Sequence, residues 1–173
     1  MNSQLSIAVV TTTLRNLLTQ AIRAMPDAEV TAKPPHRART GHDTGNQLNL
    51  FLHQAAVNAT SSGKGIPKPT SEIEKNSLRL GLNLYYLITA YGKDGDDILA
   101  HRLLGMAMMI LHEHTELTAQ DMRAALPDYV HEQQEPVRVI PQPLSSDELS
   151  KLWSILQTPY EISVAYQVSV VVL

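Results

Sequence analysis

The chain has 173 residues, of which 43% are hydrophobic and 18% charged, an ordinary composition for one globular domain with a sizeable core. A net charge of −3 gives no overall attraction to nucleic acid or to an anionic membrane, and the absence of cysteine excludes disulfides and thiolate zinc sites. The sequence contains no run of about 18 apolar residues and no basic segment at its N-terminus, so it predicts neither a membrane-spanning helix nor a signal peptide.

The first half of the chain predicts one helix and three strands. Ser3 and Pro26 mark the ends of the helix, whose apolar stripe consists of Val10, Leu14, Leu17, Leu18, Ala21 and Met25. A short strand is expected at residues 29–32, and alternating leucines predict a second strand at residues 47–58. Apolar residues at even positions from 78 to 90 predict a third strand. Because Tyr85, Leu87 and Tyr91 also fill its other face, this strand should be central and covered on both sides.

Two loops separate these strands. Residues 33–45 and 59–76 are punctuated by proline and glycine, and the second loop is the most flexible stretch that the composition predicts. The first loop carries a small basic cluster, Lys33, Arg37 and Arg39, against Asp43. Without interleaved aromatic residues this cluster is weak evidence for nucleic-acid binding. It is interpreted either as part of a solvated loop or as a contact with an acidic partner protein.

The second half begins with a long helix, expected from residue 96 or 97 to about residue 112. Its segment 103–111 is apolar all round and should be largely buried. Met106, Met108 and Met109 within it are expected to pack in the core, with an adaptable interface as the alternative. A short helix follows at residues 118–126, and residues 137–140 form a brief strand between two prolines.

The C-terminal segment predicts a helix followed by one long strand. Ser145 and Glu148 form a capping box, and Trp153 lies in the middle of the apolar stripe behind it, so we expect Trp153 to anchor this helix in the core. Residues 160–173 then form a strand with apolar even positions. Its last four residues are apolar on both faces: Val170, Val171, Val172 and Leu173. We expect another chain to cover them, and the alternative is that the chain's own helices do so. The element order predicts an α+β fold with a mixed, mostly antiparallel sheet of about five strands flanked by about four helices.

The candidate residues do not have the spacing that known catalytic and metal-binding motifs require. His112 and His114 stand two residues apart, which places them on opposite sides of a helix, and His101 is about 16 Å from His112 along the helix axis. Phosphate-binding-loop, nucleophile-elbow and calcium-loop patterns are also incomplete. The sequence therefore predicts no catalytic, cofactor-binding or metal-binding residue. A metal-dependent hydrolase that uses His101, His112 and Glu113 is the alternative.

Four segments in a fixed order resemble one known family. They are LNLFLH at residues 48–53, LNLYYLITAY at 82–91, HRLLG at 101–105 with LHEH at 111–114, and LSSDELSKLWSILQTPYEISVAYQVSVVVL at 144–173. Together they resemble the cap, or tail terminator, of contractile injection systems, in the form found in extracellular phage-tail-like particles. The resemblance covers most of the chain and rests on the ordered set rather than on one motif.

This resemblance implies a single cap domain over residues 1–173, with residues 59–76 as an internal flexible loop. In the family, a hexameric ring closes the end of the inner tube and sheath distal to the baseplate and so fixes particle length. The implied partners are further copies of the chain and the sheath and tube proteins, with no nucleic acid and no membrane insertion.

The resemblance also implies assembly in the cytoplasm before the chain becomes part of a particle. The interface residues expected are Lys33, Arg37, Arg39, Val170, Val171, Val172 and Leu173, with a neighbouring subunit or a sheath strand covering the last four. An assembly chaperone or adaptor that leaves the particle is a further alternative. Many family members carry extra sequence after this domain, whose role would here be missing or supplied elsewhere.

Overall fold

The computed structural model describes residues 6–39, 45–58, 80–127 and 136–172. In chain order these residues form α1 (Ser6–Ala21), β1 (Ala28–Thr31), α2 (Pro35–Ala38), β2 (Asn46–Val57), β3 (Leu80–Tyr91), the 3-10 turn η2 (Lys93–Gly95), α4 (Asp97–Glu113), β4 (Glu116–Leu117), α5 (Ala119–Ala125), β5 (Val137–Pro141), α6 (Ser146–Leu156) and β6 (Ser163–Val172). The predicted α+β class is confirmed, and the two-residue strand β4 brings the described sheet to six strands. The predicted loop at residues 59–76 lies outside the described residues.

The strands form one sheet in the order β1-β2-β3-β6-β5-β4. Only the pair β1 and β2 is parallel among these neighbours, as expected for a mixed, mostly antiparallel sheet. The long strands β3 and β6 lie in the middle and pair from Leu80 opposite Val172 to Thr89 opposite Ser163. Residues 86–90 of β3 are all buried, which confirms that this strand is central and covered on both faces.

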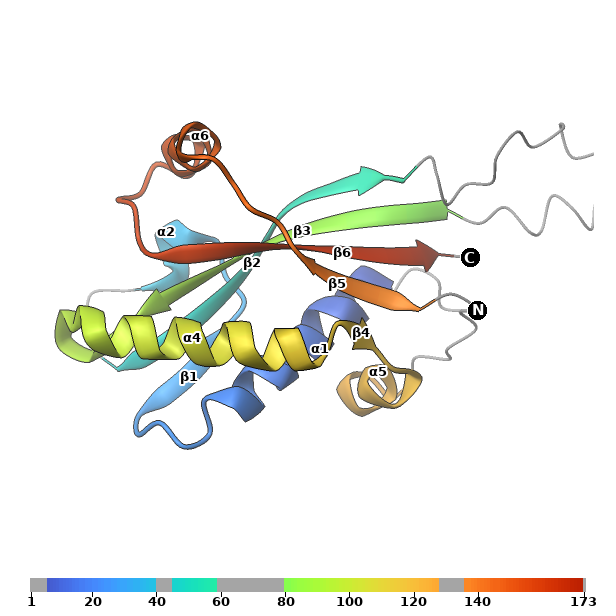
Figure 1. Ribbon diagram of the computed structural model, residues 1–173, viewed down its shortest axis with the longest axis horizontal. Helices are drawn as coiled ribbons and strands as arrows, with labels where there is room; N and C mark the ends of the chain where they lie inside the picture. Colours follow the sequence, from blue (N-terminus) through green and yellow to red (C-terminus); the bar gives the residue numbers. More distant parts are fainter. Residues whose placement is uncertain (1–5, 40–44, 59–79, 128–135, 173) are drawn as a thin grey trace, which may run out of the picture.

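Helices cover the two faces of the sheet unequally (Figure 1). α1 and α4 pack on one face, where Tyr86, Ile88, Tyr166 and Val168 belong to the main core. α6 lies on the other face and builds a separate, smaller cluster. In that cluster Trp153 is 4% exposed and packs with Leu87 and Ala165, which confirms Trp153 as the anchor of α6.

Side-chain caps fix the starts of three helices. The Asp96 side chain accepts hydrogen bonds from the backbone N–H groups of Ile98 and Leu99 at the start of α4. Capping boxes begin α5 at Thr118 and α6 at Ser145. The turn between β3 and α4 requires glycine at position 92, because a Cβ there would lie 1.8 Å from the carbonyl oxygen of Asp96.

The structure corrects the prediction for the middle of α4. Leu103 and Ala107 are fully buried, but Met108 is 45% exposed and Met109 is 60% exposed, so the expected core packing of these two methionines is wrong. α4 lies on the surface of the sheet, and a helix in that position buries only one side. Its outer side carries exposed apolar residues among polar ones, including Ile98 at 72%.

Several predicted boundaries also change. α1 ends at Ala21 rather than at Pro26, and its expected start at Ser3 lies outside the described residues. The segment 33–45 was expected to be a loop, yet it contains the short helix α2, with Pro35 in its first turn, where a proline costs no hydrogen bond. The last strand begins at Ser163 rather than residue 160, because residues 157–162 carry the chain from α6 to the sheet. Tyr160 is 58% exposed and meets the Trp153 ring edge-on. From Tyr166 onward the even positions up to residue 170 are buried, as predicted.

Candidate functional site

The expected basic cluster separates into two different environments. Lys33 and Arg37 are exposed, whereas Arg39 is half-buried. The Arg39 guanidinium donates to the carbonyl oxygens of Gly45 at 2.7 Å and Gly92 at 3.1 Å, and it lies 5.5 Å from the centroid of the Tyr91 ring. Arg39 therefore ties the α2 segment to the end of β3. Contact of Lys33 and Arg37 with an acidic partner stays a prediction.

A buried carboxamide network holds the α2 segment on the sheet. The Asn49 side chain accepts from Thr31 Oγ1 at 2.8 Å and from the Lys33 N–H at 3.1 Å, and it donates to the Lys33 carbonyl oxygen at 2.9 Å. Gln47 donates through Nε2 to Thr31 Oγ1 and to the carbonyl oxygen of Ala38. Asn49 is 0% exposed and Gln47 is 1% exposed. The sequence pattern missed this role, because polar residues at alternate strand positions ordinarily indicate a solvent-facing side.

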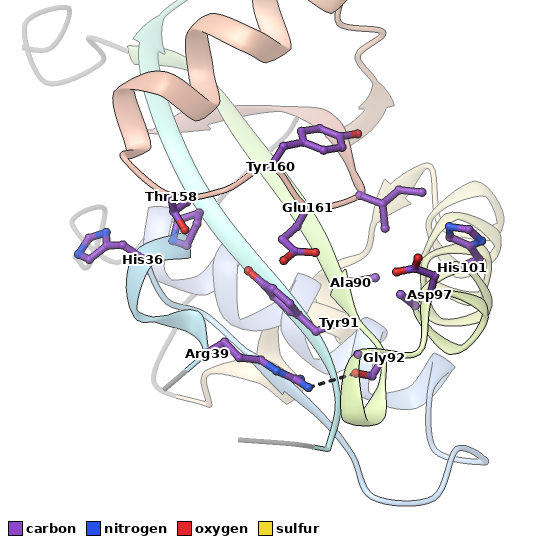
Figure 2. Close-up of a pocket in the computed structure, with 14 residues that line it drawn as sticks. His36, Arg39, Ala90, Tyr91, Gly92, Asp97, His101, Thr158, Tyr160 and Glu161 are labelled. Atoms are coloured by element: carbon purple, nitrogen blue, oxygen red, sulfur yellow. Dashed lines mark hydrogen bonds between the residues drawn. The ribbon is translucent and has the colours of Figure 1, made fainter. Parts of the chain in front are cut away.

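The α2 segment forms one wall of a cleft (Figure 2). The cleft has a volume of about 520 Å³ and lies between α2, the end of β3, the start of α4 and the segment that follows α6. Its polar and aromatic lining includes Arg39, Tyr91, Asp97, His101, Tyr160 and Glu161. Sequence reasoning missed Glu161, although it is the only charged residue after Lys151 and so stood out in an apolar segment.

The charges in this cleft are unevenly compensated. Burial raises the pKa of Glu161, the nearby Asp97 carboxylate raises it further, and Arg39 opposes both effects. Burial likewise raises the pKa of Tyr91 to about 12, with Glu161 adding to the rise and Arg39 opposing it. Tyr91 is therefore protonated at neutral pH. The cleft can accept a positively charged or hydrogen-bond-donating group beside Glu161.

The histidines of the hydrolase alternative do not come together. His101 lines the cleft, but His112 lies about 16 Å further along α4, and both are exposed. Glu113 is the last residue of α4 and is also exposed. Among the described residues, no group of three or more His, Cys, Asp or Glu side chains is placed to hold a metal ion.

The end of β6 was the second expected interface. Val170 is 3% exposed and belongs to the chain's own main core. For this residue the alternative therefore holds, because the chain itself covers it. Val171 and Val172 pair through their backbones with Gly81 and Leu80 of β3. The side chains of Val171 and Val172, and the whole of Leu173, lie outside what the structure describes, so their contact with another chain stays a prediction.

A longer stretch of β2 has a described strand on one side only. β1 pairs with residues 46–49 only, so residues 50–57 have β3 on one side and no described strand on the other. This open edge contains no charged residue and no proline, and Val57 at its end is 63% exposed. Natural sheets usually protect such edges with charges, prolines or bulges, and here the register shift between Leu52 and Gln54 is the only one of these devices within residues 50–57. The edge is suited to pairing with an extended segment.

Comparison with known proteins identifies the family. The family model of the Pvc16 N-terminal domain matches residues 9–173. The chain belongs to this family. The match confirms the resemblance to the terminator family of contractile injection systems that the sequence pattern predicts. A comparison with curated protein sequences finds no match.

Two solved structures share the fold of this Pvc16 N-terminal domain family member. One is the sheath/tube terminator of an extracellular contractile injection system, PVC, in the extended state, with a TM-score of 0.57 and 16% identity over 92% of this chain and 55% of that chain. The other is the tube-terminating cap of the anti-feeding prophage, with a TM-score of 0.57 and 15% identity over 92% of this chain and 53% of that chain. This chain thus spans about half the length of the chains it matches. No helix in the described part of the chain is long and apolar enough to cross a membrane.

Proposed function

We propose that this chain provides the ring-forming domain of a sheath and tube terminator in a contractile injection particle. The observation that carries the proposal is the match of the Pvc16 N-terminal domain family to residues 9–173. The fold supports it, because the two structural relatives, described as a sheath/tube terminator and a tube-terminating cap, cover 92% of the chain.

The proposed mechanism is geometric and needs no chemistry. Identical subunits in head-to-tail contact close into a ring, here a hexamer, when the rotation between neighbours suits it. One side of the ring docks on the ends of the inner tube and sheath. The other side offers no further docking surface, so growth stops and the particle length is fixed. The chain would assemble in the cytoplasm and then remain in the particle.

The open edge of β2 supports one mode of sheath attachment. Residues 50–57 pair with β3 on one side, and no described strand occupies the other side. A sheath strand that pairs there gains affinity from main-chain hydrogen bonds without demanding particular side chains. The exposed cations Lys33 and Arg37 supply a separate contact for an acidic surface of the sheath or tube.

Localisation in purified particles tests the proposal. A tagged chain is expected at one end of each particle, and deletion of the chain is expected to give particles of uncontrolled length. Label along the full sheath would contradict a terminator role. Particles that require the chain for assembly but do not contain it would identify a chaperone or adaptor instead.

Charge substitution tests the edge. Ala55→Lys with Val57→Lys places two cations on the open edge and should remove the chain from the particle end without changing its melting temperature. Asn16→Lys with Gln20→Lys, on exposed positions of α1, also adds two cations; it is the matched control and should leave incorporation unchanged. Normal incorporation of the edge variant would exclude strand pairing at β2.

A further inference from the structure

The outer side of α4 carries an apolar ridge. Ile98 and Met109 are 72% and 60% exposed, and they lie on one helix face with Arg102 and Gly105 between them. A surface helix ordinarily places charged residues on this side, yet Arg102 is the only charged residue between Ile98 and Glu113. Nothing lies within 4 Å of the position that a Cβ on Gly105 would take, so another backbone can approach closely there. We call Ile98, Arg102, Gly105 and Met109 the α4 ridge.

The opposite face of the sheet carries a groove. A hollow of about 500 Å³ beside α6 is lined by Leu149, Trp153 and Tyr160. Its lining also includes a row of small side chains one turn apart, Ser146, Ser150 and Ser154. We call this hollow the α6 groove.

Trp153 lines the α6 groove with its indole ring. The side chain is 4% exposed, and the chain itself encloses its Nε1 atom. A segment that lies in the groove therefore packs on the ring and does not bond to this N–H.

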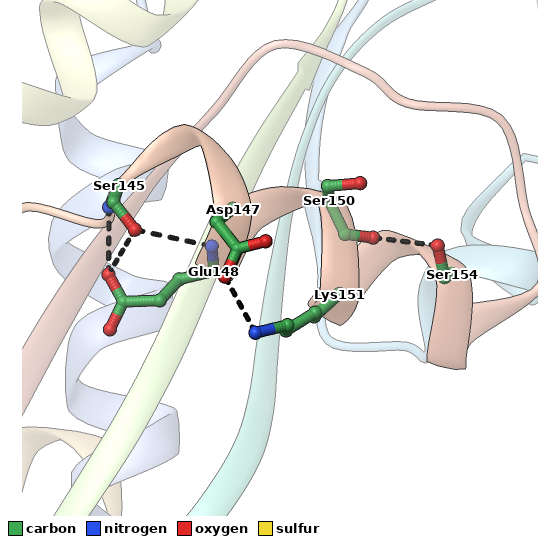
Figure 3. A network of polar contacts seen from close by, with 6 residues as sticks. All are labelled: Ser145, Asp147, Glu148, Ser150, Lys151 and Ser154. Carbon is green, nitrogen blue, oxygen red and sulfur yellow. Dashed lines mark hydrogen bonds and ion pairs between the residues drawn. The ribbon is translucent and has the colours of Figure 1, made fainter.

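Charges near the two surfaces are complementary. The first two turns of α6 hold Asp147 and Glu148 against the single cation Lys151 (Figure 3). Lys151 is already paired with Asp147 at 2.6 Å, which leaves a net negative charge at this end of the helix. Arg102 on the α4 ridge has no ion pair among the described residues, so it matches this negative end.

The dimensions and placement also agree. Ile98 to Met109 spans about 16 Å of helix, and Ser146 to Ser154 spans about 12 Å, with Tyr160 beyond it. Because α4 and α6 lie on opposite faces of the sheet (Figure 1), the ridge and the groove of one chain are separated by the sheet. A ridge-to-groove contact must therefore join two copies, and it is head-to-tail, as a closed ring requires.

We propose that the α4 ridge of one copy seats in the α6 groove of the next, an inference that rests on the proposed ring. Met109 packs over Trp153, the small serines allow the two helix backbones to approach, and Arg102 lies against the acidic start of α6. The occupant is a second copy of this chain. A two-fold contact between two α4 ridges would leave the α6 groove unused.

Because the chain contains no cysteine, disulfide trapping gives a direct test. Particles are produced with the double variant Met109→Cys with Ser150→Cys, oxidised, denatured and run on a non-reducing gel. A ladder of cross-linked chains is expected, and particles with either single variant should yield uncross-linked chain only. The matched control pairs Met109→Cys with Gln20→Cys, an exposed position on α1, and should give no ladder.

The outcomes separate the two proposals. If the chain is present in particles but the double variant gives no ladder, the ridge-to-groove contact is wrong and the terminator proposal stands. Dimers from Met109→Cys alone would indicate two-fold ridge pairing and overturn the inference. If the chain is missing from wild-type particles, the proposed function itself fails. As a second measurement, Met109→Glu should lower incorporation by more than about tenfold without changing the melting temperature, and Arg23→Glu should not.

Discussion

Replacing Trp153 by alanine tests how α6 is held to the sheet. A tryptophan buries roughly 200 Å², worth about 5 kcal/mol at about 25 cal/mol per Å², and this is an upper value because the unfolded chain already buries part of that area. Trp153 contacts fully buried Leu87 and nearly buried Ala165, but the surrounding leucines of α6 are only half-buried. The helix can therefore settle partly into the space that is left. We expect a loss of about 3 kcal/mol, at the low end of the range for large-to-small core substitutions.

Thermal and urea unfolding followed by far-UV circular dichroism measure this loss. For a domain of this size, about 3 kcal/mol lowers the melting temperature by roughly 6–12 °C. Ile155→Ala is the matched control, because Ile155 is on the same helix and 77% exposed, and it should change stability by less than about 0.5 kcal/mol. Trp153→Phe keeps most of the apolar contact and should lose less than about 1.5 kcal/mol. A Trp153→Ala variant that melts with the wild type would refute the anchoring of α6 through this side chain.

Three further substitutions test individual polar groups. Burial raises the pKa of Glu161 above its ordinary 4.5, so the folded chain holds this proton more tightly than the unfolded chain and loses stability as pH rises through the raised pKa. In urea unfolding, the Glu161→Gln variant should therefore be more stable than the wild type at neutral pH and equally stable in acid. Burial lowers the pKa of His53 below 6.5, so stability is lost as pH falls from about 6.5 through the lowered pKa, and His53→Gln should show a flatter dependence over that window. Tyr86→Phe removes the 2.8 Å hydrogen bond to Thr11 Oγ1 and should cost about 1 kcal/mol or less in thermal unfolding, because Thr11 keeps its bond to the carbonyl oxygen of Ile7; a larger loss would show a rearranged core.

Where local chemistry decides the structure, the sequence was informative. The caps at Asp96, Thr118 and Ser145 depend on side chains within three residues, and all three are present. The sequence of β3 predicted a central strand, because apolar residues occupy both of its faces. The order of apolar segments also resembled the family that the comparison then identified.

Long-range packing explains what the sequence did not predict. Met108 and Met109 sit among apolar neighbours in the chain, and only the position of α4 on the sheet decides which side of the helix is exposed. Asn49 is fully buried because the α2 segment folds over β2, an event that no local pattern reports. The cleft around Glu161 joins three separate parts of the chain, so its residues share no motif.

The pairing of β3 with β6 bears on how the domain responds to mechanical force. The two strands form one uninterrupted antiparallel ladder in the middle of the sheet, from Leu80 opposite Val172 to Thr89 opposite Ser163. A load that slides β3 past β6 stretches all the hydrogen bonds of the ladder together, whereas a load that pulls one end sideways breaks them one after another. In the proposed terminator, a load between sheath and tube would pass through this domain. The direction of that load relative to β3 and β6 would then set whether the domain resists it or yields.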